Sequence, residues 1–252
     1  MSKEQKNKFP SEVIDLPSKG KLYPKDSPLA SGKVEIKYMT AREEDILTSQ
    51  NLITKGIVIE RLLDSLIITP NVTSSDLLIG DKNAIMVAAR ILAYGPDYTV
   101  EVIHPTTNEK LQHTFNLADC PFKDISEDIE GNEFEIELPI SKKIVKFRLL
   151  TGKEEKLIEN EIKSKQKVGL QVAPTLTTRL KYSITSVDGE TDKPIINTFV
   201  ENMLSKDSWT LRSKILEVSP DIELKQEVDL GGEMVEVDIP LTIEFFWPSA
   251  VT

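Results

Sequence analysis

Two pairs of adjacent carboxylates, Glu43-Glu44 and Glu154-Glu155, are the first residues in this sequence whose types suggest chemistry. Paired acids serve as general acid and general base in many enzymes. Neighbouring positions on a helix point about 100° apart, however, so the two side chains of a pair do not converge on one substrate atom. Negative charge in the first turn of a helix is also favoured by the helix dipole. We therefore interpret both pairs as residues that begin helices.

A metal site would have to use His104 and His113, with Asp119 and Cys120 as the nearest further ligands. One cysteine and two histidines are too few for a structural zinc site of Cys and His ligands within one chain. Two surface histidines are thus the favoured interpretation, with metal binding as the alternative. The sequence also has no phosphate-binding glycine loop and no nucleophile elbow. We predict no catalytic residue, no metal and no cofactor.

The composition is that of an ordinary soluble globular protein of 252 residues with a net charge of −10. Residues 1–33 hold seven lysines against four acids, so a short basic arm precedes an acidic body. This balance favours protein partners over nucleic acid. No apolar run approaches the roughly 20 residues that cross a bilayer, and the N-terminus lacks a secretory signal. The default expectation is residence in a cytoplasm without membrane contact.

A capped helix start is written twice, in "KYMTAREEDIL" (Lys37–Leu47) and "FRLLTGKEEKLI" (Phe147–Ile158). In each copy a strand-like run of alternating apolar and polar residues ends at a threonine, and a glutamate follows three positions later. Thr40 with Glu43, and Thr151 with Glu154, each predict a capping box. The same helix start after the same kind of strand suggests a repeated unit.

Further matches extend the repeat along the chain. "GDKNAIMVAARILAYGPD" (Gly80–Asp97) aligns with "LSKDSWTLRSKILEVSPD" (Leu204–Asp221), and Asp81 and Ser205 stand where N-caps are expected. Other aligned segments are Ile14-Asp15-Leu16-Pro17 with Ile136-Glu137-Leu138-Pro139, and Arg61-Leu62 with Arg179-Leu180. Each half closes with two alternating runs around a turn, and Gly231-Gly232 is a strong hairpin signal in the second.

The predicted fold is therefore α+β, with two tandem similar units. Each unit has a first strand, capped helices and a terminal antiparallel hairpin. The expected boundaries are an extended basic arm at 1–33, a first unit at 12–122 that includes part of the arm, an acidic linker at 123–133 that buries nothing, and a second unit at 134–252. The first strand of the second unit could pair with either sheet edge, which leaves a swap between units open.

The arm offers the first candidate partner-binding residues. Pro17 and Pro24 hold it extended, and Leu16, Leu22 and Tyr23 are its sizeable apolar groups, with Gly20 between them. An extended segment suits addition to a sheet edge or a groove of another subunit, or of the acidic body itself. We expect the arm to be mobile in the isolated protein. Deletion of residues 1–25 would then leave the melting temperature almost unchanged.

The apolar end of the chain offers the second candidate. Phe245, Phe246 and Trp247 form an aromatic segment that is either tucked into the core or presented to a partner. Trp209, Ile215 and Leu216 also lie at helical spacing, and this pattern is more typical of core than of a binding stripe.

These segments together resemble a known family. "LPSKGKLYP" (Leu16–Pro24), "KVEIKYMTAREEDIL" (Lys33–Leu47) and "DIPLTIEFFWP" (Asp238–Pro248) are similar to stretches of the baseplate hub proteins of T-even-type contractile-tailed phages, also described as baseplate hub assembly chaperones. Related tail proteins often carry a Cys-x-x-Cys pair in the terminal hairpin. The corresponding turn here, "EVDLGGEMVEV" (Glu227–Val237), has no cysteine, so a zinc-dependent role is in doubt.

The resemblance implies a non-enzymatic phage tail protein, either a baseplate hub component or a hub-assembly chaperone. Its implied partners are other baseplate hub proteins and the tape-measure protein. Its implied location is the host cytoplasm during assembly and then the virion tail. The alternative, suggested by the two hairpins, is a nucleic-acid-binding ribbon protein, against which the acidic body argues. The sequence leaves the oligomeric state open.

Overall fold

The computed structural model describes residues 9–104, 106–167, 173–230 and 232–247. The architecture is α+β with small antiparallel sheets, as the sequence predicts. The elements in chain order are β1 (Ser11–Asp15), η1 (Pro28–Ser31), β2 (Lys33–Lys37), α1 (Ala41–Thr48), α2 (Gln50–Lys55), α3 (Val58–Leu66), α4 (Ile79–Tyr94), β3 (Asp97–Ile103), β4 (Lys110–Asn116), η2 (Leu117–Asp119), β5 (Phe134–Glu137), β6 (Ile144–Phe147), α5 (Gly152–Lys167), α6 (Thr175–Ser183), β7 (Ile184–Val187), α7 (Lys193–Glu201), α8 (Ser205–Val218), β8 (Lys225–Asp229), β9 (Met234–Asp238) and η3 (Glu244–Phe246).

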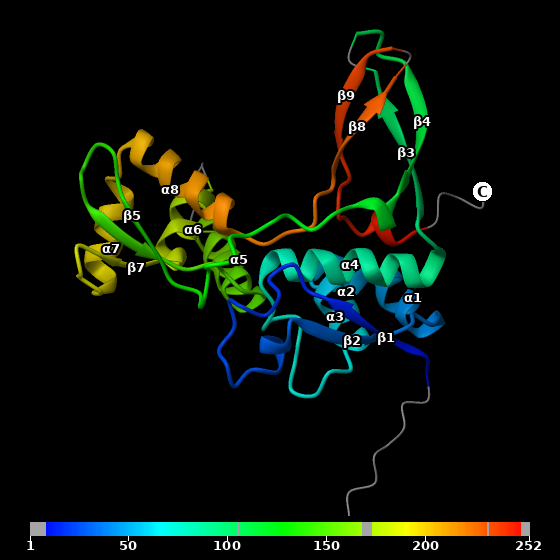
Figure 1. Cartoon of the computed structure of the whole chain (residues 1–252), viewed down its shortest axis with the longest axis horizontal. Coiled ribbons are helices and arrows are strands. Elements are labelled where there is room, and N and C mark those ends of the chain that lie inside the picture. Colours follow the sequence, from blue (N-terminus) through cyan, green and yellow to red (C-terminus); the bar gives the residue numbers. More distant parts are fainter. Residues whose placement is uncertain (1–8, 105, 168–172, 231, 248–252) are drawn as a thin grey trace, which may run out of the picture.

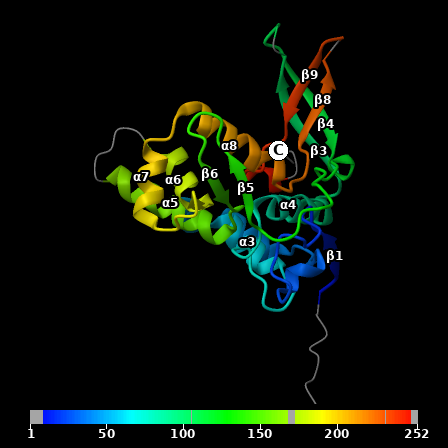
Figure 2. The same cartoon turned by 60° about the vertical axis from the view of Figure 1, so that its left-hand side comes forward.

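The chain is arranged in three parts (Figure 1). The first half places the β1-β2 pair and α1–α3 below the long helix α4. The second half packs α5–α8 around the three-stranded sheet β5-β6-β7. The hairpins β3-β4 and β8-β9 stand together on the opposite side of α4, and a second view shows the same arrangement (Figure 2). Parts of the predicted arm (1–8), one glycine of the predicted turn (Gly231) and the C-terminal end of the predicted second unit (248–252) lie outside the described residues.

The two hairpins come from different halves of the chain and pack against each other. His104 Nε2 lies 3.1 Å from the Leu230 carbonyl oxygen, and the Thr106 hydroxyl donates to Glu233 at 3.0 Å. The apolar side chains of Tyr98 and Val228, one from each hairpin, are buried. The second hairpin thus packs on the hairpin of the first half, and not only within the half of the chain to which it belongs.

Two connecting segments run antiparallel between the halves and the hairpins. The Lys123 amide donates to the Asp221 carbonyl at 2.8 Å, and the Glu223 amide donates to the Pro121 carbonyl at 2.8 Å. The acidic segment 123–133, expected to bury nothing, continues from this crossing and buries Ile125. Its Gly131 amide also donates to the Lys21 carbonyl at 2.8 Å, so the segment packs against the N-terminal region.

The two capped helix starts form as predicted. Helix α1 begins directly after Thr40, with both halves of the capping box present. Helix α5 begins directly after Thr151, whose amide and hydroxyl both donate to Glu154, at 3.0 and 2.5 Å. A side chain that reaches back three residues needs only local geometry, which is why the spacing predicts it.

The predicted N-caps of the two long helices are wrong. The N-cap of α4 is Leu78 and that of α8 is Leu204, so Asp81 and Ser205 lie inside the first turns. The Asp81 carboxylate instead accepts hydrogen bonds from the segment after β1. The Asp207 carboxylate in α8 likewise accepts from the segment after β5. Each carboxylate thus joins its helix to the loop that follows the first strand of its half, and this tertiary contact takes the side chain away from a capping role.

Both halves begin with a pair of antiparallel strands, continue with helices and end with a hairpin, although the second half adds β7 to its first sheet. Strand β5 pairs with β6 of the same half, so its first strand is not swapped. A common origin of the halves and the predicted unit boundaries stay predictions.

The halves approach each other closely where α4 begins. A Cβ atom built on Gly80 would lie 1.8 Å from the Pro220 carbonyl oxygen, so only glycine allows this approach. Nearby, Asn83 Nδ2 donates to Asp221 Oδ1 at 3.0 Å, which joins α4 to the segment after α8. The sequence gives no sign that Gly80 has this role, because it reads equally well as the end of the preceding loop.

Candidate partner-binding surface

The carboxylate Glu43 is held by four donors and is a structural residue. Its side chain accepts from Lys37 Nζ at 2.7 Å, from the Ser65 hydroxyl at 2.6 Å, and from the Thr40 amide and hydroxyl at 2.9 and 2.6 Å. Burial alone would raise the pKa of Glu43, but the hydrogen bonds from Lys37, Ser65 and Thr40 outweigh it and lower the pKa to about 2. A carboxylate held ionised in this way stabilises the helix start.

The stability of the protein is expected to depend on the ionisation of Glu43. Because its pKa falls from 4.5 to about 2 on folding, its contribution is complete above pH 4.5 and is lost as the pH falls towards 2. Glu43→Gln should lower the free energy of unfolding at neutral pH and make it fall less steeply over this acid range. Urea unfolding at a series of pH values measures both effects. The exposed Asp45→Asn is the control, and an unchanged pH profile in Glu43→Gln would contradict the assignment.

The other members of the carboxylate pairs are also engaged in structural contacts. Glu44 accepts from the Tyr94 hydroxyl at 2.8 Å, and Glu155 accepts from both terminal nitrogens of Arg179 at 2.7 and 2.6 Å. Glu154 accepts from Arg148 at 3.1 Å in addition to Thr151. The carboxylates of each pair therefore point to different partners, and neither pair forms an acid–base site.

The histidines and the cysteine are spread over the hairpin layer. His113 lies edge-on against the Phe115 ring with centroids 4.7 Å apart, and Cys120 accepts from Gln226 Nε2 at 3.0 Å. Burial raises the pKa of the Cys120 thiol. Over the described part of the chain, no three His, Cys, Asp or Glu side chains gather closely enough to hold a metal ion. In the same residues, no helix has the length and apolar character needed to span a membrane.

The N-terminal segment is packed into the chain's own core, which corrects the expectation of a loosely packed arm. Leu16, Leu22 and Tyr23 are buried, as are Pro17 and Gly20. Only its first part is extended, where β1 pairs antiparallel with β2; the chain then turns at residues 17–22. Partner binding through these residues stays a prediction, because their side chains contact this chain and leave only exposed neighbours for another protein.

A buried hydrogen-bond chain fixes this segment to α4. The Leu78 amide donates to the Tyr23 hydroxyl at 2.8 Å, which donates to Asp81 Oδ2 at 2.6 Å, while the Ser18 amide donates to Asp81 Oδ1 at 2.9 Å. Burial is the main cause that raises the pKa of both Tyr23 and Asp81. The Ser18 and Leu78 amides, the Tyr23 hydroxyl and both Asp81 carboxylate oxygens are each hydrogen-bonded. Specific contacts as well as apolar burial therefore bind the segment.

The aromatic segment near the end of the chain is tucked into the core and is not presented to solvent. Phe245 and Phe246 are fully buried in η3, and the Phe245 ring lies 5.0 Å from that of Tyr98. Arg90 Nε in α4 donates to the Phe245 carbonyl at 3.1 Å. Trp247 is partly buried against the same core. Partner binding by these three residues stays a prediction, and only Trp247 retains exposed surface for it.

Helix α8 presents an apolar face to solvent that the sequence interpretation assigned to the core. Trp209 is 62% exposed and Leu216 is 69% exposed, whereas Leu211 and Val218 are buried. The buried face runs through Leu211, Ile215 and Val218, a second stripe at helical spacing in the same sequence. Of the three residues expected in the core, only Ile215 packs against it.

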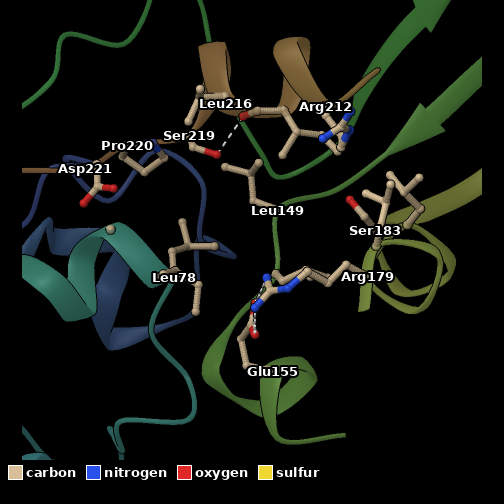
Figure 3. Close-up of a pocket in the computed structure, with 16 residues that line it drawn as sticks. Leu78, Leu149, Glu155, Arg179, Ser183, Arg212, Leu216, Ser219, Pro220 and Asp221 are labelled. Carbon is tan, nitrogen blue, oxygen red and sulfur yellow. Dashed lines mark hydrogen bonds and ion pairs between the residues drawn. The ribbon is translucent and has the colours of Figure 1, made fainter. Parts of the chain in front are cut away.

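A groove of about 340 Å³ lies beside this face, at the junction of the two halves (Figure 3). We call it the junction groove. Leucines from different parts of the chain line it, among them Leu78 before α4, Leu149 after β6, and Leu216 on α8. Leu176 on α6 lines it as well and is 43% exposed. The groove is thus an apolar surface built by both halves, and the sequence signals it only through the second stripe on α8.

Two arginines are among the residues that line the junction groove (Figure 3). Arg179 is neutralised by its two-pronged contact with Glu155. Arg212 makes a single hydrogen bond, from Nε to the Ser208 carbonyl at 3.3 Å, and its terminal nitrogens have no partner among the described residues. The groove therefore combines an apolar floor with one positive charge that lacks a counter-ion there.

The chain matches a known protein family. A protein-family model described as T4 bacteriophage base plate protein matches residues 10–247, which include both halves, the hairpins and the junction groove. No curated protein and no solved structure shows a significant match.

Proposed function

The chain belongs to the T4 bacteriophage base plate protein family, and from this membership we propose that it acts in the tail as a baseplate hub component or a hub-assembly chaperone. Membership indicates a structural protein associated with the phage tail and with other baseplate proteins. The match over residues 10–247 is the observation that carries the proposal, because it covers nearly the whole chain and not one shared motif.

The proposed mode of action is binding through protein surfaces, without catalysis. The acidic pairs cap helices and bind cationic or hydroxyl partners inside the chain, which supports this view. An exposed tryptophan and an unneutralised arginine beside an apolar groove are typical of protein interfaces. The proposed partners are other hub proteins, with the tape-measure protein as one candidate. The proposed location is the host cytoplasm during assembly and then the tail.

Nucleic-acid binding by the hairpins is the weaker alternative. The hairpin segments 97–116 and 223–244 contain ten acidic residues and two lysines. Both lysines are paired with carboxylates, Lys110 with Glu101 at 2.6 Å and Lys225 with Glu236 at 2.9 Å. A surface that binds phosphates needs the opposite charge balance. The charge of the hairpins thus supports protein partners.

A phage that lacks this gene tests the proposal. We expect it to make no infectious tails, and a plasmid copy of the gene should restore them. Mass spectrometry of purified particles then separates the two roles, since a hub component is retained and an assembly chaperone is absent. Normal yields of infectious tails from the deleted phage would overturn the proposal.

A further inference from the structure

We infer that the junction groove and the adjoining face of α8 bind an amphipathic helix of another baseplate protein, one that carries a carboxylate opposite Arg212. The inference rests on the proposed function and adds to it the place and chemistry of contact. It starts from apolar surface that has no role inside the chain. Trp209 and Leu216 are both more than half exposed, although Leu211 and Val218 already bury the inner face of the same helix.

The exposed side chains have the spacing of a helix-binding surface. Trp209, Arg212 and Leu216 lie three and four residues apart, so they form one stripe about 10 Å long on α8. Leu176 on α6 lines the same junction groove as Arg212 and Leu216. A partner helix that lies along the stripe would insert residues spaced i, i+3 or i+4, and i+7, the usual pattern for a helix held in a groove.

The size of the groove limits what enters it. Its volume of about 340 Å³ is near the lower end of the roughly 300–1,000 Å³ typical of ligand pockets. It therefore accommodates a few aliphatic side chains and not a second folded domain. Because the lining comes from both halves, a bound helix would also hold α4 and α8 in a fixed relation.

The charge of the groove selects the partner. Arg212 is the lining cation without a carboxylate partner among the described residues, since Arg179 is bound by Glu155. Asp221, the second acid of the lining, accepts from Asn83 and from the Ile222 amide. An arginine next to apolar surface forms strong, oriented bonds with a carboxylate that becomes shielded from water. A carboxylate beside the partner's aliphatic residues is therefore the complementary group.

Complementation of a phage lacking the gene provides the test in the assembled system. Leu216→Asp and Arg212→Glu should each lower the yield of infectious particles at least about tenfold, the effect expected for a lost interface contact of ordinary size. Their matched controls, Leu157→Asp and Arg42→Glu, change exposed residues of the same types on α5 and α1 and should complement fully. Unchanged melting temperatures of the purified variants show that loss of function is not loss of folding.

Suppressors of Arg212→Glu identify the partner's chemistry. The inference predicts that selected revertants change an acidic residue to lysine or arginine in a helix of another baseplate gene. Revertants confined to this gene, together with self-association by sedimentation that Leu216→Asp abolishes, would instead assign the surface to a second copy and overturn the inference. Full complementation by both groove variants would overturn it as well, while the requirement for the gene, and thus the proposed function, would stand.

A direct measurement uses Trp209 as the reporter. In a Trp247→Phe background Trp209 is the only tryptophan. The probes are capped amphipathic peptides of about 14 residues, long enough to form helix, with leucines on one face and a glutamate or a lysine beside them. The glutamate peptide should change the fluorescence saturably and bind at least about tenfold more tightly than the lysine peptide, and Arg212→Glu should reverse that preference. Equal binding of the two peptides, or no binding, would count against the inference.

Discussion

Deletion of residues 1–25 is expected to abolish the cooperative thermal unfolding of the chain. Leu16, Leu22 and Tyr23 are all buried, and full burial of each such side chain stabilises by about 1.5–3 kcal/mol. The deletion also removes β1 and leaves β2 with an unpaired edge. The combined burial free energy of the three side chains is comparable with the roughly 5–15 kcal/mol of total stability of a typical domain. This expectation reverses the one from sequence alone, because the segment completes the core.

Differential scanning calorimetry of the shortened chain measures the effect. The single substitutions Leu16→Ala and Val13→Ala separate burial from chain length, since Val13 lies in the same segment with its side chain exposed. Leu16→Ala should cost about 2–5 kcal/mol, and Val13→Ala much less. A shortened chain that melts within a few degrees of the intact protein would show that the segment is not part of the core.

Asp81→Ala is expected to lower the free energy of unfolding by about 2–6 kcal/mol. The substitution leaves two buried donors, the Ser18 amide and the Tyr23 hydroxyl, without their acceptor, and each unsatisfied buried group costs about 1–3 kcal/mol. Urea unfolding at neutral pH measures the change. The exposed Asp45→Ala is the control, and a loss no larger than that of the control would contradict the role of Asp81.

A double-mutant cycle tests whether the hydrogen-bond chain acts as a unit. Tyr23→Phe leaves Asp81 Oδ2 and the Leu78 amide without a partner, so it should also destabilise. Because both substitutions break the same bond, the double variant should lose clearly less than the sum of the two single losses. Additive losses would mean that Tyr23 and Asp81 stabilise the fold independently.

Contacts that span a few residues could be predicted from the sequence. The two capping boxes depend on a threonine and a glutamate three positions apart, and this local geometry forms wherever the helix does. The family could also be found in this way, since the segments around Leu16–Pro24 and Lys33–Leu47 carry a specific pattern that the family match supports. The acidic pairs were interpreted correctly for the same reason, because the helix fixes the direction of adjacent side chains.

The candidate site could not be found in this way. In α8 two apolar stripes, Leu211–Ile215–Val218 and Trp209–Leu216, have nearly the same helical spacing, and only the packing of the rest of the chain decides which one faces water. Arg212 gains its significance from the leucines that other elements bring beside it. Spacing within one helix contains no information about those neighbours.

By itself the sequence determined the α+β class, the capped helix starts, the terminal hairpins and the family, since each depends on neighbouring residues or on a motif. Only the tertiary structure decided that the N-terminal segment is part of the core and that the hairpins of the two halves pack together. It alone also showed that the junction groove opens where the two halves meet. Tyr23 and Asp81 are 58 residues apart in the chain, and Gly80 meets Pro220 across an even longer separation. Such contacts form because distant segments compete for the same buried space and hydrogen-bond partners, and that competition is settled only when the whole chain folds.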